Sequence, residues 1–183
     1  MKSFKKHIKA AAGAVVYIFL NYFVTNIPCW HIRKLLYMLF GMKIGSGSRL
    51  NMKVLVWDPW KIKIGKGTIV NEYALLDGRG GLTIGDGTSV AMWAILYSSS
   101  HYADSASFEY YTKPTSVGNS CWISARAIVL PGSKIDDRVI IGANSVFKGE
   151  TEKSGIYAGN PSQFIRKRKV DENYEREWIT HFR

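Results

Sequence analysis

Three short stretches with one pattern decide the fold: Ile44-Gly45-Ser46-Gly47-Ser48, Ile64-Gly65-Lys66-Gly67-Thr68 and Ile84-Gly85-Asp86-Gly87-Thr88. Two variants of the pattern follow, Val117-Gly118-Asn119-Ser120-Cys121 and Ile141-Gly142-Ala143-Asn144-Ser145. Around these stretches an apolar residue returns every six positions, and the longest series is Val117, Ile123, Val129, Ile135, Ile141 and Phe147. A fixed period of this kind indicates a chain built from repeated structural units.

The six-residue period fits neither an α-helix nor a simple hairpin. It predicts short strands that each turn one aliphatic side chain inward and are joined by tight corners. The small residues after each aliphatic residue suit corners where φ is positive or where a bulky side chain has no room. Three such strands complete a coil of about 18 residues, and stacked coils form a parallel β-helix. The expected fold class is therefore an all-β solenoid.

The repeat is interrupted once, after Leu96. The chain there reads Tyr97-Ser98-Ser99-Ser100-His101-Tyr102, and the next copy of the repeat begins only at Val117. We expect residues 102–116 to form a loop inserted at one corner, because long loops on a regular scaffold usually carry function. His101 stands at the start of this insertion and is the only histidine among the repeats. It is the candidate catalytic residue.

These motifs resemble those of the left-handed β-helix, hexapeptide-repeat acyltransferases, in particular the branch that O-acetylates sugars and the polysaccharides of bacterial capsules or lipopolysaccharides. The resemblance covers residues 44–168. It implies a left-handed parallel β-helix, acetyl-CoA as co-substrate, a homotrimer with active sites between subunits, and His101 as general base. Because a thioester is already activated, acyl transfer to a hydroxyl group needs a base and a stabilised oxyanion, without a Ser or Cys nucleophile.

The resemblance places the acetyl-CoA site on the C-terminal coils. Backbone groups of two alanines would contact the pantetheine arm, and basic side chains would meet the phosphates. For residues 166–169, the alternative to CoA binding is a basic tail exposed to solvent. For Trp122, the alternative is packing within a coil. The candidate CoA-binding residues are Trp122, Ser124, Ala125, Ala143, Lys148, Arg166 and Lys167.

The candidate acceptor site lies on the coils before the histidine. In sugar acetyltransferases of this fold an Asn and an Asp in this region bind substrate hydroxyl groups, and Asn71 and Asp77 match them by position. Trp93 and Tyr97 are candidates to stack on a sugar ring. Asn and Asp at corners also serve turns, which is the alternative for Asn71 and Asp77.

The N-terminal segment, residues 1–43, combines positive charge with strong hydrophobicity. The first 57 residues contain nine Lys or Arg and no Asp or Glu, and residues 10–32 carry no charge. We expect Pro28 to end a first helix and residues 30–42 to form a second helix with one apolar face. The interpretation is that both helices lie on a membrane interface with basic residues toward lipid phosphates. The alternatives are a true membrane span, and a helical cap buried on the body or on a neighbouring subunit.

The 183 residues divide into this N-terminal segment, a β-helix domain over residues 44–160, and a basic C-terminal tail over residues 161–183 that is expected to be helical. Two cysteines exclude a disulfide framework and a four-cysteine zinc site. One histidine in the repeats excludes a three-histidine metal site, so no metal is expected. The formal net charge of +11 comes without a nucleic-acid-binding motif.

The function expected from the sequence is acetyl-CoA-dependent O-acetylation of a carbohydrate, namely a bacterial surface polysaccharide or its lipid-linked precursor. A cytoplasmic location, peripheral to the inner face of the membrane, follows from that expectation. Two alternatives stay open at this point. One is N-acetylation of an amino sugar or its nucleotide-linked form, and the other is a β-helical scaffold without enzymatic activity.

Overall fold

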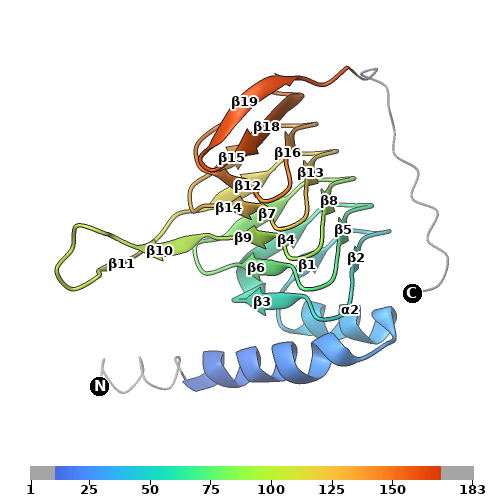
Figure 1. The fold of residues 1–183 in the computed structure, drawn as a ribbon. Helices are drawn as coiled ribbons and strands as arrows, with labels where there is room; N and C mark the ends of the chain where they lie inside the picture. Colours follow the sequence, from blue (N-terminus) through green and yellow to red (C-terminus); the bar gives the residue numbers. More distant parts are fainter. Residues whose placement is uncertain (1–10, 170–183) are drawn as a thin grey trace.

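The computed structural model describes residues 11–169, which form a β-helix with three parallel sheets as its sides (Figure 1). Sheet A contains β1 (Lys43–Ile44), β4 (Ile62–Ile64), β7 (Leu82–Ile84), β12 (Thr115–Val117) and β15 (Lys134–Ile135). Sheet B contains β2 (Arg49–Leu50), β5 (Ile69–Val70), β8 (Ser89–Val90), β13 (Trp122–Ile123), β16 (Ile140–Ile141), β18 (Gly155–Gly159) and β19 (Ser162–Lys167). Sheet C contains β3 (Leu55–Trp57), β6 (Leu75–Asp77), β9 (Ile95–Leu96), β14 (Ile128–Val129) and β17 (Val146–Phe147).

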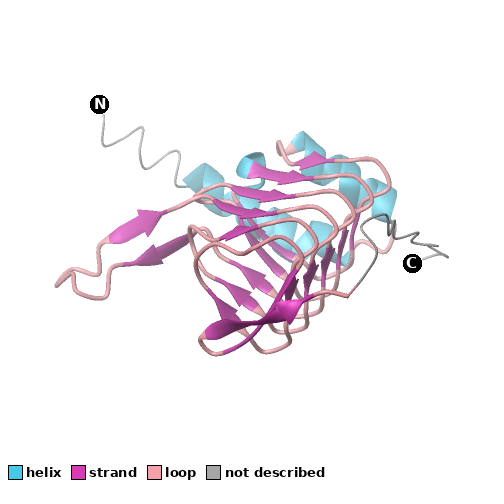
Figure 2. Cartoon of the chain, turned by 90° about the horizontal axis from the view of Figure 1, so that it is seen from above, coloured by secondary structure: helices cyan, strands magenta, loops and turns pink. Residues whose placement is uncertain are grey.

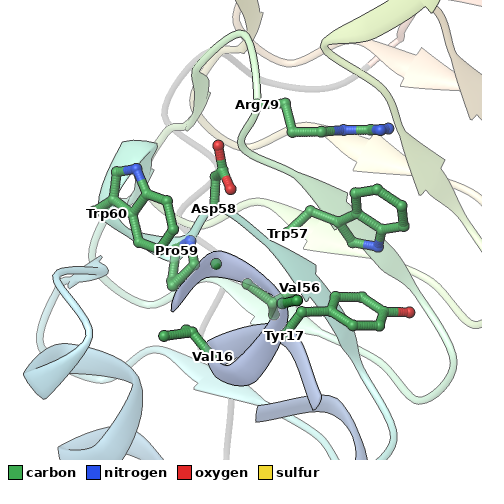
Figure 3. A pocket seen from close by; sticks show the side chains of 10 residues that line it. Val16, Tyr17, Val56, Trp57, Asp58, Pro59, Trp60 and Arg79 are labelled. Atoms are coloured by element: carbon green, nitrogen blue, oxygen red, sulfur yellow. The ribbon is translucent and has the colours of Figure 1, made fainter. Parts of the chain in front are cut away.

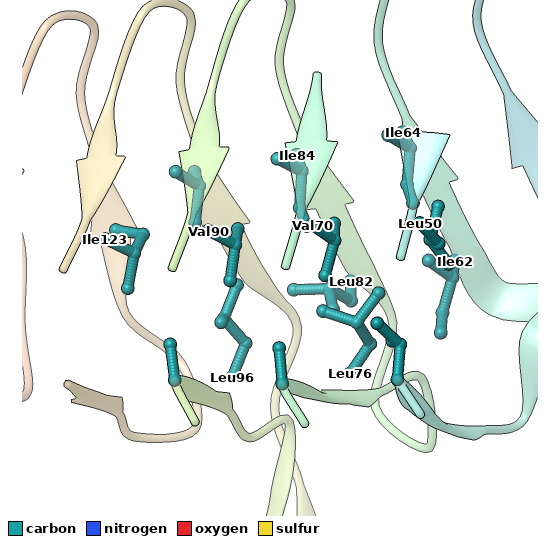
Figure 4. Packing of buried hydrophobic residues seen from close by; sticks show 14 of the residues in the cluster. Leu50, Ile62, Ile64, Val70, Leu76, Leu82, Ile84, Val90, Leu96 and Ile123 are labelled. Atoms are coloured by element: carbon teal, nitrogen blue, oxygen red, sulfur yellow. The ribbon is translucent and has the colours of Figure 1, made fainter. Parts of the chain in front are cut away.

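The six-residue series is the core of the β-helix. Like positions of successive coils pair directly, so that Ile64 lies beside Ile84 and Val70 beside Val90. These side chains point inward in columns along the axis (Figure 4), and Val70, Val90 and Leu96 are 0% exposed. Each such side chain contributes about 1.5–3 kcal/mol by its burial. The repeat therefore stabilises the fold through contacts between neighbouring coils, as in other solenoids.

The residue that ends each repeat, a Ser or Thr in all repeats but that of Cys121, takes part in a hydrogen-bonded ladder at the corner between sheets A and B. Thr68 Oγ1 donates to Gly85 O of the next coil (2.6 Å) and accepts from Thr88 N (3.1 Å). Thr88 Oγ1 repeats the arrangement with Gly118 O (2.8 Å) and Cys121 N (3.0 Å). Each hydroxyl satisfies two backbone groups of the following coil, which is the physical reason for a hydroxyl at this position.

The two glycines of the repeat answer different needs at that same corner. A Cβ on Gly85 would come within 2.5 Å of Asn119 Oδ1 and 2.6 Å of the Gly118 carbonyl carbon, so the first glycine allows the coils to stack closely. The second, Gly87, has a φ of +61° in the left-handed region. Ser120 occupies the equivalent place with a φ of +51°. The second glycine position therefore accepts a side chain, whereas the first has no room for one.

Helical segments close the N-terminal end of the β-helix (Figure 1). Residues 11–18 are α-helical and continue through the π-helical turn η1 (Phe19–Phe23) and the 3₁₀ turn η2 (Val24–Asn26). The second helix, α2 (Trp30–Leu39), begins after Pro28, as the sequence predicts. Within residues 11–169, no helix has the length and hydrophobicity needed to cross a membrane.

The C-terminal end of the β-helix is closed by strands. β18 pairs with β16 in parallel, and β19 turns back to pair with β18 in antiparallel orientation. Residues 162–167 are thus a strand and not the expected helix, because they pair with the edge that β18 would otherwise leave open. The remainder of the tail, residues 170–183, lies outside the described part of the chain.

Candidate functional site

The insertion after Leu96 is a two-stranded arm at the corner between sheets C and A. β10 (Ser99–His101) and β11 (Tyr110–Thr112) pair in antiparallel orientation with His101 opposite Tyr110. The arm projects away from the coils (Figures 1 and 2). At its base Lys113 N donates to Ser98 O over 2.9 Å, so the chain leaves and rejoins the coil at adjacent points. The expected loop over residues 102–116 is therefore in part a hairpin strand.

His101 lies near the base of this arm, and its side chain is exposed. Its Nδ1 is hydrogen-bonded to the Phe108 carbonyl oxygen across the hairpin, at 2.5 Å. Because a carbonyl oxygen only accepts, Nδ1 carries the proton, and the neutral imidazole then keeps a lone pair on Nε2. The edge of the Tyr110 ring packs against the imidazole with the ring centroids 5.5 Å apart. His101 is thus held in the tautomer that a general base requires.

Asp77 is buried beneath the base of the arm, where it is 0% exposed. Arg79 Nε donates to its Oδ1 (2.9 Å), and Ser98 N and Ser99 Oγ donate to its Oδ2 (3.0 and 2.7 Å). Burial by itself would raise the pKa of Asp77, but the hydrogen bonds from Arg79 and Ser99 outweigh burial and hold that pKa below its ordinary value. Asp77 thus anchors the strand that carries His101 two residues after Ser99, and its predicted contact with the acceptor stays a prediction.

A cavity of about 490 Å³ opens at the same corner, between the first helix and β3 (Figure 3). Tyr17, Trp57 and Trp60 line it together with Asp58 and Arg79. The Arg79 guanidinium lies 3.9 Å from the centroid of the Trp57 ring, and the Tyr17 ring meets Trp57 edge-on at 5.1 Å. The buried indole nitrogen of Trp57 has no hydrogen-bond partner within residues 11–169. Aromatic faces beside charged groups suit a ligand rich in hydroxyl groups.

This cavity was not predicted from the sequence, although a signal for it exists. Val56 and Ile64 are eight positions apart, as are Leu76 and Ile84, whereas the spacing is six elsewhere except across the insertion between Leu96 and Val117. The two additional residues in each coil enlarge the corner between sheets C and A, where the 3₁₀ turn η3 (Pro59–Lys61) forms one wall of the cavity. The enlarged corner and the arm are therefore successive departures from the repeat on one edge of the β-helix.

Two of the predicted acceptor residues lie at a different corner, between sheets B and C. Asn71 Nδ2 donates to Val90 O over 2.9 Å, within the stack of coils. Trp93 stacks on Tyr73 with the ring centroids 4.3 Å apart and is 49% exposed. Tyr97, in contrast, directly follows β9 and leads into the arm. Within one chain, sheet C separates Asn71 and Trp93 from His101.

Three of the predicted CoA-binding residues share the corner between sheets B and C with Asn71. Ala125 and Ala143 are exposed there in successive coils, and Asn144 N donates to Ala125 O over 3.0 Å. Ser124 lies beside them but is only 5% exposed. Ser124, Ala125 and Ala143 therefore form a row of small residues along one edge of the β-helix.

The remaining predicted CoA-binding residues lie in three other places. Trp122 is on the outer face of sheet B and is 45% exposed. Lys148 is exposed directly after β17, on the edge that also carries the arm. Arg166 and Lys167 are exposed on β19, where Lys167 Nζ lies 3.4 Å from Glu152 Oε2. One chain therefore brings together only part of the predicted site.

The side chains of residues 11–169 include no group of three or more His, Cys, Asp or Glu that could hold a metal ion.

Comparison with known proteins supplies the family. A family model described as "Bacterial transferase hexapeptide (six repeats)" matches residues 114–149. The putative colanic acid biosynthesis acetyltransferase WcaF of Escherichia coli K12 is 33% identical over 137 residues, which cover 74% of this chain and 75% of WcaF. This chain belongs to the bacterial hexapeptide-repeat transferase family. A probable macrolide acetyltransferase of Lysinibacillus sphaericus is 44% identical over 61 residues. That alignment covers 33% of this chain and about a third (34%) of the relative.

A solved structure extends the likeness in fold to nearly the whole chain. The hexapeptide-repeat-containing acetyltransferase of Vibrio cholerae, determined in complex with acetyl-CoA, has a TM-score of 0.78 with this chain at 23% identity. The superposition covers 90% of each chain. The repeats indicate a parallel β-helix, and the fold of this member of the family is the left-handed form that the resemblance implies.

Proposed function

We propose that this protein transfers the acetyl group of acetyl-CoA to a hydroxyl group of a carbohydrate. The observation that carries the proposal is the hydrogen bond from His101 Nδ1 to Phe108 O. It leaves the lone pair on Nε2, at the end of β10, to act as a base. Membership of the hexapeptide-repeat transferase family and relatives named as acetyltransferases support it.

The chemistry assigned to this chain is a proton transfer in both directions. Acetyl-CoA supplies a thioester, which is already activated. His101 Nε2 accepts the hydroxyl proton as the acceptor oxygen attacks the acetyl carbonyl carbon, and the C–S bond breaks as the ester forms. His101 then returns the proton to the departing sulfur. The hydrogen bond with Phe108 O stabilises the imidazolium that exists between these steps.

The cavity at the corner between sheets C and A, on the same edge of the β-helix as the arm, is the proposed acceptor site. Its aromatic walls, Tyr17, Trp57 and Trp60, can stack on sugar rings, and Arg79 and Asp58 can bind hydroxyl or acidic groups. Arg79 also donates to Asp77, so an occupied cavity is coupled to the strand that carries His101. WcaF is named for colanic acid biosynthesis, which supports a bacterial surface polysaccharide or its lipid-linked precursor as the acceptor of this protein.

The separation of the predicted residues supports a homotrimer. His101 and Lys148 lie on one edge of sheet C, while Asn71, Ala125 and Ala143 lie on the other. A second copy that offers its edge between sheets B and C to the arm would complete the site with those residues. The exposed Trp122 and the basic Arg166 and Lys167 have the chemistry to hold the pantetheine arm and the phosphates of CoA. Since acetyl-CoA is present in the cytoplasm, we place the reaction there.

The test is acetyl transfer from radiolabelled acetyl-CoA to a panel of neutral oligosaccharides and amino sugars. We expect labelled product whose acetyl group is released by mild alkaline hydroxylamine, because an ester is cleaved under conditions that leave an amide intact. A hydroxylamine-stable product would identify an N-acetyltransferase. Calorimetry with CoA provides the second measurement, and a protein that binds no CoA would be a scaffold and not this enzyme.

A further inference from the structure

The inner side of the N-terminal helices is attached to the first coil by hydrogen bonds. Asn21 Nδ2 donates to Val56 O (2.8 Å), Val56 N donates to Asn21 Oδ1 (2.7 Å), and Thr25 Oγ1 donates to Val54 O (3.0 Å). Within residues 11–169, β3 is the edge strand of sheet C at the N-terminal end and pairs with no strand other than β6, so these polar side chains satisfy its open edge. The polar residues within the apolar segment therefore bind the body.

Arg33 fastens the second helix in a similar way. It is 2% exposed, and its guanidinium donates to Leu50 O (2.9 Å), to Pro28 O (3.0 Å) and to Ile27 O. One buried cation thus connects α2, the link between the helices and the first coil. Because both helices are attached through their inner sides, their outer sides form a surface of defined shape.

That outer surface is strongly apolar. It holds nine of the eighteen large hydrophobic side chains that are exposed in residues 11–169. Phe19 contacts Phe40 with ring centroids 5.7 Å apart, which joins the two helices into one continuous patch. Patches of this extent are uncommon on soluble monomers and usually mark an interaction surface. The N-terminal apolar face consists of Val15, Ile18, Phe19, Tyr22, Phe23, Ile32, Leu35, Met38 and Leu39.

The positive charge of the N-terminal end favours an anionic partner for this face. Every formally charged residue among the first 57 is Lys or Arg, and Lys34, Lys43 and Lys53 belong to the described part of this end. A second copy placed end to end would bring two positive ends together, which is unfavourable. An apolar helical face in a segment whose charged residues are all Lys or Arg is typical of helices that lie in the interface of an anionic bilayer.

We propose that the N-terminal apolar face docks on the surface of an anionic lipid bilayer, with both helices in the plane of the interface. The other side of the first helix, through Gly13, Val16 and Tyr17, lines the cavity assigned to the acceptor. Docking would place the mouth of that cavity at the headgroups. If the proposed acetyl transfer holds, the acceptor is a glycan whose lipid carrier stays in the bilayer while its sugar enters the cavity.

The experiment is co-sedimentation of the full chain with vesicles of phosphatidylcholine alone or mixed with phosphatidylglycerol. We expect binding to the anionic vesicles that weakens as the salt concentration rises. The double variant Phe23→Ser/Leu39→Ser removes two well-exposed apolar side chains and should weaken binding at least about tenfold. The control Phe164→Ser/Ile165→Ser alters two exposed apolar residues at the opposite end and should bind like the wild type.

A fluorophore on Cys29 gives an independent reading, because Cys29 is exposed between the helices and Cys121 is buried. Its emission should shift to the blue with anionic vesicles, and the shift should be lost in Phe23→Ser/Leu39→Ser. Absent vesicle binding, equal binding by both double variants, or concentration-dependent self-association abolished by Phe23→Ser/Leu39→Ser would each overturn the proposal. Vesicle binding needs no turnover, so a protein that binds vesicles but transfers no acetyl group would refute only the proposed function.

Discussion

Two corners of the same coils follow opposite rules. At the corner between sheets A and B, successive coils repeat the same glycine and the same side-chain ladder, from Thr68 through Thr88 to Cys121. At the corner between sheets C and A, each coil differs, with the η3 turn, then Arg79, then the arm. Repetition lets each coil stabilise the next. The irregular corner can carry chemistry because the stack does not depend on it.

Replacing His101 tests this contrast with the largest expected effect. His101→Ala removes the proposed base and should lower the rate of acetyl transfer by about 10²–10⁴-fold. The thermal midpoint should stay close to that of the wild type, because the side chain is exposed on the arm. Steady-state kinetics and a thermal melt on the same preparation measure both quantities.

His101→Asn is the matched control, since its amide nitrogen can still donate to Phe108 O while no base replaces Nε2. We expect it to be as inactive as His101→Ala. Substantial activity in His101→Asn would mean that the hydrogen bond, and with it the position of the arm, matters more than a base. The general-base assignment would then fail.

Gly85 tests the regular corner, where the expected effect is on stability. The added methyl of Gly85→Ala would lie 2.5 Å from Asn119 Oδ1 and close to the Gly118 backbone, so the coils must separate at a cost of about 1–3 kcal/mol or more. Gly87→Asn is the control, because Asn144 already has a φ of +55° in the same place of its own repeat. Urea denaturation should show a large decrease in the free energy of unfolding for Gly85→Ala, and a decrease of about 1 kcal/mol or less for Gly87→Asn.

The regular corner could be predicted from the sequence much better than the irregular corner. The inward positions, the corners and the two roles of glycine were predictable because one physical requirement recurs in every coil. The Asp77 network and the cavity were not, since each occurs once and depends on which strands meet in space. The partners of Asp77, Ser98 and Ser99, are more than twenty positions away along the chain, so the sequence offered no sign of this network. Residues 162–167 form a strand instead of the expected helix because β18 offers them an edge.

Asp77 lies at the irregular corner and should give a smaller effect on activity than His101. In Asp77→Asn an amide NH₂ must face at least one of the donors Arg79, Ser98 and Ser99, which should cost about 1–3 kcal/mol of stability. Because the strand of His101 loses its anchor, we expect kcat to fall by about tenfold, less than the loss of a base. Asp104→Asn, at an exposed position in the arm, should change neither quantity.

The pH dependence of stability tests whether the ionised carboxylate of Asp77 is what stabilises the folded protein. The pKa of Asp77 is lowered in the folded protein, so its contribution is present above the unfolded value of about 4 and is lost as the pH falls toward the lowered pKa. The difference in unfolding free energy between wild type and Asp77→Asn should therefore shrink below about pH 4. A difference that stays constant down to pH 2 would show that the ionised carboxylate contributes nothing.

Cys121 gives the smallest expected effect and returns to the regular corner. Its Sγ takes the place of the ladder hydroxyl and donates to Asp136 O at 3.0 Å. Burial raises the pKa of Cys121 to about 12, so at pH 8 only about one thiol in ten thousand is a thiolate. Iodoacetamide should label the exposed Cys29 and leave Cys121 unmodified until the protein unfolds.

Cys121→Ser restores the hydroxyl that Ser48 supplies in its own repeat, and its unfolding free energy should stay within about 1 kcal/mol of the wild type. Fast labelling of Cys121 in the folded protein would show that the ladder of hydrogen bonds opens in solution. The repeated ladder would then not be what stabilises the corner between sheets A and B.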